Sequence, residues 1–252
     1  MVRILWFLGY PDQALKRSQE ATTLAQALAH PFSVALAYMF AALVSQLCRE
    51  ERATQEWAEK AIAVCTGHGF AFYSAMGTIL RGWALVEQGQ GAEGIAQVRH
   101  GLAAWRATGS ELFRPHLLAL LAEAHGKGGE VEEGLTVLAE ALSAASKSGR
   151  RFYTAELYRL QGELMLQCRG QKPEAAVQQE AEVCFRQALD IAHQQSAKAW
   201  ELRAATSLAR LWQQQGKKTE AHQLLSEIGN WFTEGFDTKD LQEARALLEE
   251  LT

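Results

Sequence analysis

The chain has 252 residues, of which 48% are hydrophobic and 21% charged, and its formal net charge is −4. This charge gives no global attraction to nucleic acid, so we expect no nucleic-acid partner. The one obvious basic cluster, Lys147, Arg150 and Arg151, is more typical of a solvated loop at a helix end. Strong helix formers dominate and only 4 prolines occur, which predicts an all-helical protein.

The first residues do not predict export or membrane insertion. Residues 1–8 contain one basic residue, and their apolar run is too short for a signal peptide. Residues 32–48 are uncharged but lie at the short limit for a membrane span, so we expect them to form a buried helix. The 4 cysteines are scattered, as is usual for buried thiols in a reducing cytosol. The sequence therefore predicts a cytoplasmic protein with no membrane partner.

Small residues recur along the chain in sets of three, at the same spacing in each set. The sets begin at residues 9, 49, 89, 129, 176 and 216, so they are 40, 40, 40, 47 and 40 residues apart. This regularity predicts an array of one supersecondary unit. Only Arg49 and Ile228 are not small among the sets, which are Gly9/Ala14/Ala21, Arg49/Thr54/Ala61, Gly89/Gly94/Gly101, Gly129/Gly134/Ala141, Ala176/Ala181/Ala188 and Gly216/Ala221/Ile228.

A 3.6-residue hydrophobic period divides the chain into antiparallel helix pairs, often separated by glycine-containing turns. The more apolar first helices are expected at about residues 32–48, 70–88, 112–126, 152–168 and 197–215. The more polar second helices are expected at about residues 11–29, 51–68, 91–108, 130–148, 174–194 and 217–228. Because set members seven residues apart share one helix face, their small side chains should let the neighbouring helix approach closely.

The glycine before each second helix and the alanines along it resemble the tetratricopeptide repeat, over nearly the whole chain. This resemblance implies an all-α fold, a right-handed α-solenoid that forms a single domain over residues 1–252. About five full helix pairs would follow a partial first pair. The larger residues of the repeat are only partly kept, since Ser45 and His125 stand where an aromatic is usual. Armadillo and HEAT-type solenoids, which also repeat every 40–47 residues, are the second interpretation.

Four longer stretches resemble the C-terminal tetratricopeptide region of large bacterial signalling proteins. Those proteins join a nucleotide-cyclase or other effector domain to a regulatory ATPase, and none of the catalytic domains is present here. The resemblance implies a sensor or protein-interaction array from such a regulator, or a free-standing relative. The stretches are residues 5–14 (LWFLGYPDQA), 77–84 (GTILRGWA), 155–164 (AELYRLQGEL) and 231–238 (WFTEGFDT).

The two ends of the array differ in the sequence. Residues 1–8 supply only the last part of a first helix, so we expect apolar residues 4–7 to pack against upstream sequence or another molecule. Weak self-association through this end is the resulting hypothesis. At the other end, residues 239–250 should form a capping helix with Asp237 or Thr238 as its N-cap. The 47-residue step gains its length around residues 168–174, as an inserted loop.

No motif supports catalysis, a cofactor or a metal. Residues 89–94 match the dinucleotide fingerprint Gly-x-Gly-x-x-Gly, but a helix rather than the required strand is expected before them. The chain contains no Gly-x-x-x-x-Gly-Lys-Ser/Thr phosphate loop, and Cys65 with His68 makes only half of a zinc pattern. We therefore expect a protein that is not an enzyme.

In tetratricopeptide arrays the first helices line a concave groove, so the resemblance implies a peptide or protein partner there. The leading hypothesis is a non-catalytic protein–protein interaction scaffold or sensor module. The alternatives are self-assembly and a regulatory domain for a small effector, which a deep closed pocket would favour. Trp83 is equally consistent with a core residue, and Arg159 can pair with Glu163 four residues on. The candidate groove contacts are Met76, Trp83, Glu87, His116, Glu123, Arg159, Glu163, Arg203 and Arg210.

Overall fold

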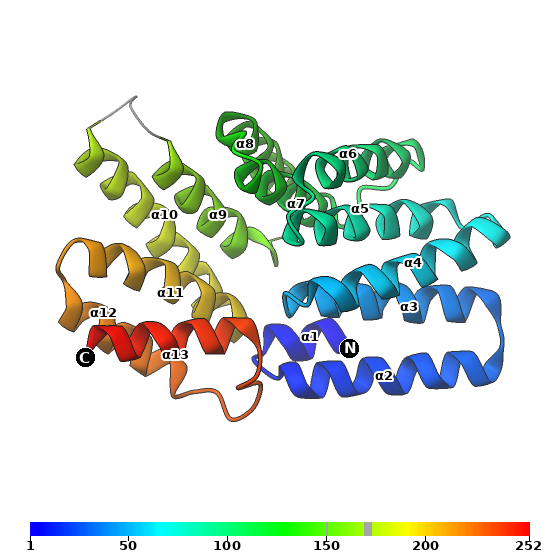
Figure 1. The fold of residues 1–252 in the computed structure, drawn as a ribbon, viewed down its shortest axis with the longest axis horizontal. Helices are drawn as coiled ribbons and strands as arrows, with labels where there is room; N and C mark the ends of the chain where they lie inside the picture. The colour runs from blue at the N-terminus through cyan, green and yellow to red at the C-terminus, as the bar shows by residue number, and fades with distance from the viewer. Residues whose placement is uncertain (150, 169–172) are drawn as a thin grey trace.

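The computed structural model describes residues 1–149, 151–168 and 173–252, and these residues form helices and turns without a strand. Arg150 of the basic cluster and residues 169–172 of the inserted loop lie outside the described residues. Figure 1 shows the chain as an array of antiparallel helices. The helices are α1 (Val2–Phe7), α2 (Pro11–Leu28), α3 (Pro31–Leu47), α4 (Glu51–His68), α5 (Ala71–Glu87), α6 (Gly91–Ala107), α7 (Arg114–Lys127), α8 (Val131–Ser148), α9 (Thr154–Gln167), α10 (Glu174–Gln194), α11 (Lys198–Gln214), α12 (Lys218–Gly229) and α13 (Lys239–Leu251).

The helices expected from the hydrophobic period are confirmed, and their ends agree to within two residues. The largest shifts are at the starts of α7 and α9. Helix α7 begins only at Arg114 because Phe113 takes a left-handed conformation, with φ of 66°. Pro115 therefore lies in the first turn of α7, where its missing N–H costs no hydrogen bond. The last helix does begin after Thr238, but the side chain of Thr238 makes no capping hydrogen bond.

Residues in the left-handed backbone conformation follow most of the helices. In the first part of the chain they recur about every 20 residues. Glycine suits this conformation because it has no Cβ. Arg49 adopts it too, with φ of 62°, where four of the other sets have glycine. For a residue with a side chain this conformation costs about 1–2 kcal/mol. The positions in this series are Gly9, Ala29, Arg49, Gly69, Gly89, Gly109, Gly129 and Gly149.

The second and third members of the sets are buried where helices pack, except Ala21, which is exposed, whereas a Cβ at Gly89 or Gly129 would meet nothing within 4 Å. A Cβ atom added to Gly94 would lie 2.6 Å from the backbone oxygen of Gly82. A Cβ added to Gly101 would lie 3.0 Å from the backbone oxygen of Ala75. The α5 and α6 backbones therefore pack against each other without an intervening side chain. This close approach confirms the packing role expected for set members seven residues apart at Gly94 and Gly101, whereas the expectation is wrong for Ala21, whose side chain is exposed.

The array curls until its two ends meet, so the helices form a closed ring (Figure 1). Helices α3, α5, α7, α9 and α11 contact one another in sequence along the inside, and the short α1 closes the circle against α11. The indole of Trp6 packs against that of Trp200, with ring centroids 4.7 Å apart. Phe7 packs against Phe152 at 5.6 Å. Trp6 and Phe7 are therefore covered by the distant half of the same chain, and not by upstream sequence or another molecule as expected. Ile4 is 57% exposed, and weak self-association through this end stays a prediction.

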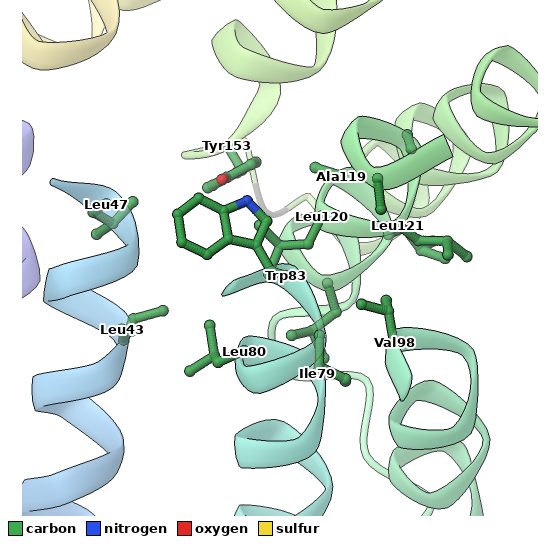
Figure 2. Packing of buried hydrophobic residues seen from close by; sticks show 14 of the residues in the cluster. Leu43, Leu47, Ile79, Leu80, Trp83, Val98, Ala119, Leu120, Leu121 and Tyr153 are labelled. Atoms are coloured by element: carbon green, nitrogen blue, oxygen red, sulfur yellow. The ribbon is translucent and has the colours of Figure 1, made fainter. Parts of the chain in front are cut away.

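The inside of the ring is filled by side chains. Figure 2 shows the Trp83 indole among Leu47 of α3, Leu120 of α7 and Tyr153 just before α9. His116 stacks on Tyr153 with centroids 4.4 Å apart. Across the ring, the His116 Nε2 atom lies 3.2 Å from the Gln46 side-chain oxygen. The concave face is therefore mostly core, and what remains accessible is its edge.

Candidate functional site

Three of the nine residues expected along a groove are buried instead. Met76 is 2% exposed, and Trp83 and His116 are each 1% exposed. A partner cannot touch these side chains in this structure, so their placement in an open groove is wrong. The reason is the ring closure, because inner helices that would flank a groove pack across it. The repeat pattern predicts which helix face points inward but not how far the inner face closes.

The other six candidates gather at one edge of the ring, around a pocket of about 200 Å³. Five of them line it directly, and Glu87 reaches it by its ion pair with Lys127. The pocket lies where the C-terminal parts of α7 and α9 face the middle of α11 and the start of α13. Its charged and polar lining consists of Arg49, Glu123, Lys127, Arg159, Glu163, Gln167, Arg203, Thr206, Ser207, Arg210, Asp240 and Glu243.

Two arginines form the deep wall of the pocket. Arg159 donates to both oxygens of Glu156, at 2.7 and 2.8 Å, and its Nη1 lies 3.4 Å from Glu163. Arg203 donates from Nε to Asp240 at 2.8 Å and lies 3.5 Å from Glu156. Burial disfavours the charged form of both side chains, but the nearby carboxylates outweigh it and raise each pKa above its usual value. Both arginines therefore stay charged and held in place.

Lys127 and Glu123 of α7 also line the pocket, and Lys127 connects it to Glu87 of α5. Lys127 pairs with Glu87 and lies 3.8 Å from Glu123, whose other oxygen accepts a hydrogen bond from the Trp83 indole at 2.9 Å. Burial and the charge of Glu123 raise the pKa of Glu87. Although burial opposes it, Lys127 and the indole lower the pKa of Glu123. The buried Trp83 thus acts on the pocket indirectly, by orienting Glu123.

The accessible edge of the pocket carries both signs of charge. Arg210 is 46% exposed in its side chain and Lys127 40%, against 34% for Glu163 and for Glu243. Such a mosaic does not select a polyanion or a polycation. Among the described residues, no cluster of histidine, cysteine or acidic side chains is arranged to hold a metal ion. Within the same residues, no helix is both long and apolar enough to cross a bilayer.

Seven of the twelve charged and polar lining residues were not among the predicted contacts, and three of the seven, Arg49, Asp240 and Glu243, come from outside the inner helices. Asp240 and Glu243 were expected to belong to a helix that only caps the end, yet Glu243 pairs with Arg49 at 2.8 Å and with Arg210 at 3.2 Å. The helix therefore caps α11 and α12 and also reaches the turn between α3 and α4. The one available signal was Arg49 itself, the charged residue where four of the other sets have glycine.

Comparison with solved structures identifies the architecture. Two crystal structures of nearly identical TPR-like repeats, from a Podosopora anserina protein assigned as a kinesin light chain, are similar to the chain. One aligns with a TM-score of 0.52 and 17% identity over 88% of this chain and 97% of that chain. The other has a TM-score of 0.51 and 18% identity over 76% and 91%. The fold is a tetratricopeptide-like solenoid. At this level of identity the likeness shows the fold alone.

Sequence comparison does not assign the chain to a family. No model of a known protein family matches the chain. An uncharacterized protein of Rhizobium meliloti (strain 1021) is 28% identical over 144 residues, which are 57% of this chain but only 13% of that protein. The chain thus matches a small part of a much longer protein. Tetratricopeptide-like arrays generally mediate protein–protein interactions and are typically not catalytic.

Proposed function

We propose that this chain is a non-catalytic protein-interaction module that takes a short charged segment of a partner at the pocket edge. The observation that carries the proposal is the convergence of six predicted contact residues on one pocket, while the rest of the concave face is filled. Residues that lie on α5, α7, α9 and α11 meet there although up to 123 positions separate them, from Glu87 to Arg210. The segment should carry charges of both signs, because the edge does.

The energetics favour recognition at the edge rather than in the depth of the pocket. Arg159 and Arg203 are already satisfied by carboxylates within the chain, and removing one partner of such a pair leaves a buried charge at a cost of about 3–5 kcal/mol. A partner gains more from the half-exposed groups, whose ion pairs are worth only about 0–1 kcal/mol and are easily exchanged. Arg210 and Lys127 are the most accessible of these groups.

A second candidate function is the binding of a small effector, and the many charged groups that line one pocket favour it. A volume of about 200 Å³ suits a molecule no larger than a short peptide, and it is below the usual 300–1,000 Å³ range of drug-sized sites. A thermal-shift screen with free amino acids and dipeptides tests this candidate directly. A rise in melting temperature that Arg210→Glu abolishes would favour the effector over the protein partner.

Selection of binding peptides from a random library on the immobilised chain tests the leading proposal. The Arg210→Glu and Lys127→Glu variants should lose the selected peptides, since both reverse an accessible charge at the pocket edge. Arg17→Glu is the matched control, because Arg17 pairs with Glu20 on the exposed face of α2, away from the pocket. Equal peptide binding by all three variants would place the interaction elsewhere on the array.

We further propose that the module is part of, or derived from, a larger bacterial signalling regulator. Two observations support this origin: the resemblance of four stretches to the repeat region of nucleotide-cyclase/ATPase fusion proteins, and the match to 13% of a long Rhizobium protein. The gene neighbourhood and the full reading frame test it. An isolated reading frame with no effector or ATPase domain in the same transcript would count against this origin.

A further inference from the structure

The contact between the two ends of the array, which we call the seam, joins residues 6–51 to residues 198–243. Charged groups make much of it. Arg49, in the turn between α3 and α4, has its Nη1 atom 3.3 Å from Asp240 Oδ1 and 2.8 Å from Glu243 Oε1. Lys239 forms a second ion pair with Glu51 at the start of α4. The start of α13 is therefore fixed to the N-terminal half of the chain by two ion-pair sites.

A third polar contact lies further along the seam. The backbone N–H of Gln13 and its side-chain amide donate to the two oxygens of Glu234, at 3.0 and 2.8 Å. The backbone N–H of Gly235 donates to Asp12 at 2.9 Å. In addition, Arg203 donates to the carbonyl oxygen of Leu47 at 2.6 Å. The segment before α13 is thus bound to the first turn of α2, which is more than 220 residues away in sequence.

The backbone of Arg49 sets it apart from the equivalent turns of the other sets. At the equivalent turns Gly9, Gly89, Gly129 and Gly216 have φ between 77° and 87°, and glycine adopts this conformation without strain. Arg49 adopts the same region at a steric cost, and its side chain is the one that crosses the seam. The residue that departs from glycine at this turn is thus the one whose side chain makes the ion pairs of the seam.

The seam also has an apolar part, in which Tyr10 packs against Trp231 with ring centroids 5.5 Å apart and Pro11 lies close to Gly235. Trp6 is buried against Trp200, and the Arg203 guanidinium lies 5.0 Å from both indole rings. Helix α1 has only 6 residues, whereas the inner helices elsewhere in the ring have 14 to 17. The side chains that form ion pairs across the seam are 10–39% exposed, and dissolved salt weakens those that solvent reaches.

We propose that the seam is an electrostatic latch: its ion pairs hold the ring closed, and their release separates the α1–α4 end from the α11–α13 end. Opening uncovers Trp6 and Trp200 on the inner face. It also dismantles the charged pocket, because Arg49 lies on one side of the seam and Asp240 and Glu243 on the other. The latch goes beyond the proposed function and is tested without any ligand.

Hydrogen exchange with mass spectrometry and small-angle scattering test the latch in Lys239→Glu and in Arg49→Gly. Arg49→Gly removes the cross-seam side chain while relieving the strained turn, so any opening cannot be attributed to local damage. We expect exchange about tenfold faster in residues 1–12, 44–52 and 231–245, a larger radius of gyration, and unchanged helix content by circular dichroism. Raised salt should increase the same exchange in the unmodified chain.

Two further variants make the result decisive. Exchanging the charges in Glu51→Lys/Lys239→Glu should restore the exchange pattern and radius of the unmodified chain. Arg17→Glu, which breaks an exposed ion pair within α2, should change neither. Unchanged exchange at the seam in both single variants, or faster exchange spread evenly over all helices, overturns the latch. Because these readouts are structural, such a result leaves the proposed binding function standing.

Discussion

The close approach of α5 and α6 makes a quantitative prediction at Gly94. A methyl group at this position would lie 2.6 Å from the backbone oxygen of Gly82 and 2.5 Å from Val86 Cγ2, where normal contacts are about 3.5 Å or more. A backbone oxygen cannot rotate away, so the two helices must separate by nearly 1 Å (about the shortfall in contact distance). Overpacking of this kind lowers the free energy of unfolding by up to about 3 kcal/mol. The higher helix propensity of alanine relative to glycine offsets about 1 kcal/mol of that loss.

Gly94→Ala should therefore lose about 2 kcal/mol of unfolding free energy, or about 4–8 °C of melting temperature for a chain of this size. The assay is thermal and urea unfolding followed by circular dichroism. Gly91→Ala is the matched control in the same helix, because a Cβ there meets nothing within 4 Å, and its melting temperature should stay the same or rise. A Gly94→Ala variant as stable as Gly91→Ala would refute the packing explanation of the repeated small residues.

Three other side chains give predictions from their burial. Trp83→Ala should lower the free energy of unfolding by about 3–5 kcal/mol in urea titrations, and a fully stable variant would contradict its place in the core. Burial lowers the pKa of His116 to about 3, whereas the unfolded imidazole titrates near 6.5. The unfolded chain then binds the extra proton, so stability should fall by about 1.4 kcal/mol per pH unit as pH drops from 6.5 towards 3. His116→Gln should remove that part of the slope in urea titrations at pH 7, 5 and 4, and an unchanged slope would show that other groups cause it. Burial raises the pKa of the Cys48 thiol to about 12. Iodoacetamide at pH 8 should therefore modify the half-exposed Cys168 before Cys48, which mass spectrometry can follow. Equal rates of modification at the two cysteines would argue against the closed seam.

Local rules were enough to predict the repeat unit of this fold. Helix ends follow from glycines such as Gly89 and Gly129, and the hydrophobic period separates inner from outer helices, because both depend on residues close in sequence. The fingerprint-like glycines of residues 89–94 serve a helix joint, as expected from the helix before them. Closure of the ring was not predictable in the same way. It depends on the small rotation between successive pairs, summed over the whole array.

In the candidate site, too, the sequence predicted the direction of the side chains but not how deeply they are buried. The inward direction of Glu123, Arg159 and Arg203 follows from helix periodicity, and the structure brings these residues together at the pocket. Their depth was not predictable, since Trp83 and His116 lie on similar faces but are covered once the ring closes. Asp240 and Glu243 were expected only as part of a capping helix, because their partner Arg49 is about 190 residues away in sequence. The sign of this contact in the sequence was that position 49 holds arginine where four of the other sets have glycine.

Carbodiimide coupling, which joins an amine directly to a carboxylate in contact with it, tests the closed ring most directly. Mass spectrometry of the monomer should find an amide link between Lys239 and Glu51, which pair across the seam. The link between Lys127 and Glu87, an ion pair between neighbouring inner helices, serves as the internal standard. Recovery of both links within one chain is the predicted result. Recovery of the Lys127–Glu87 link without the Lys239–Glu51 link would show that the two ends of the array do not meet.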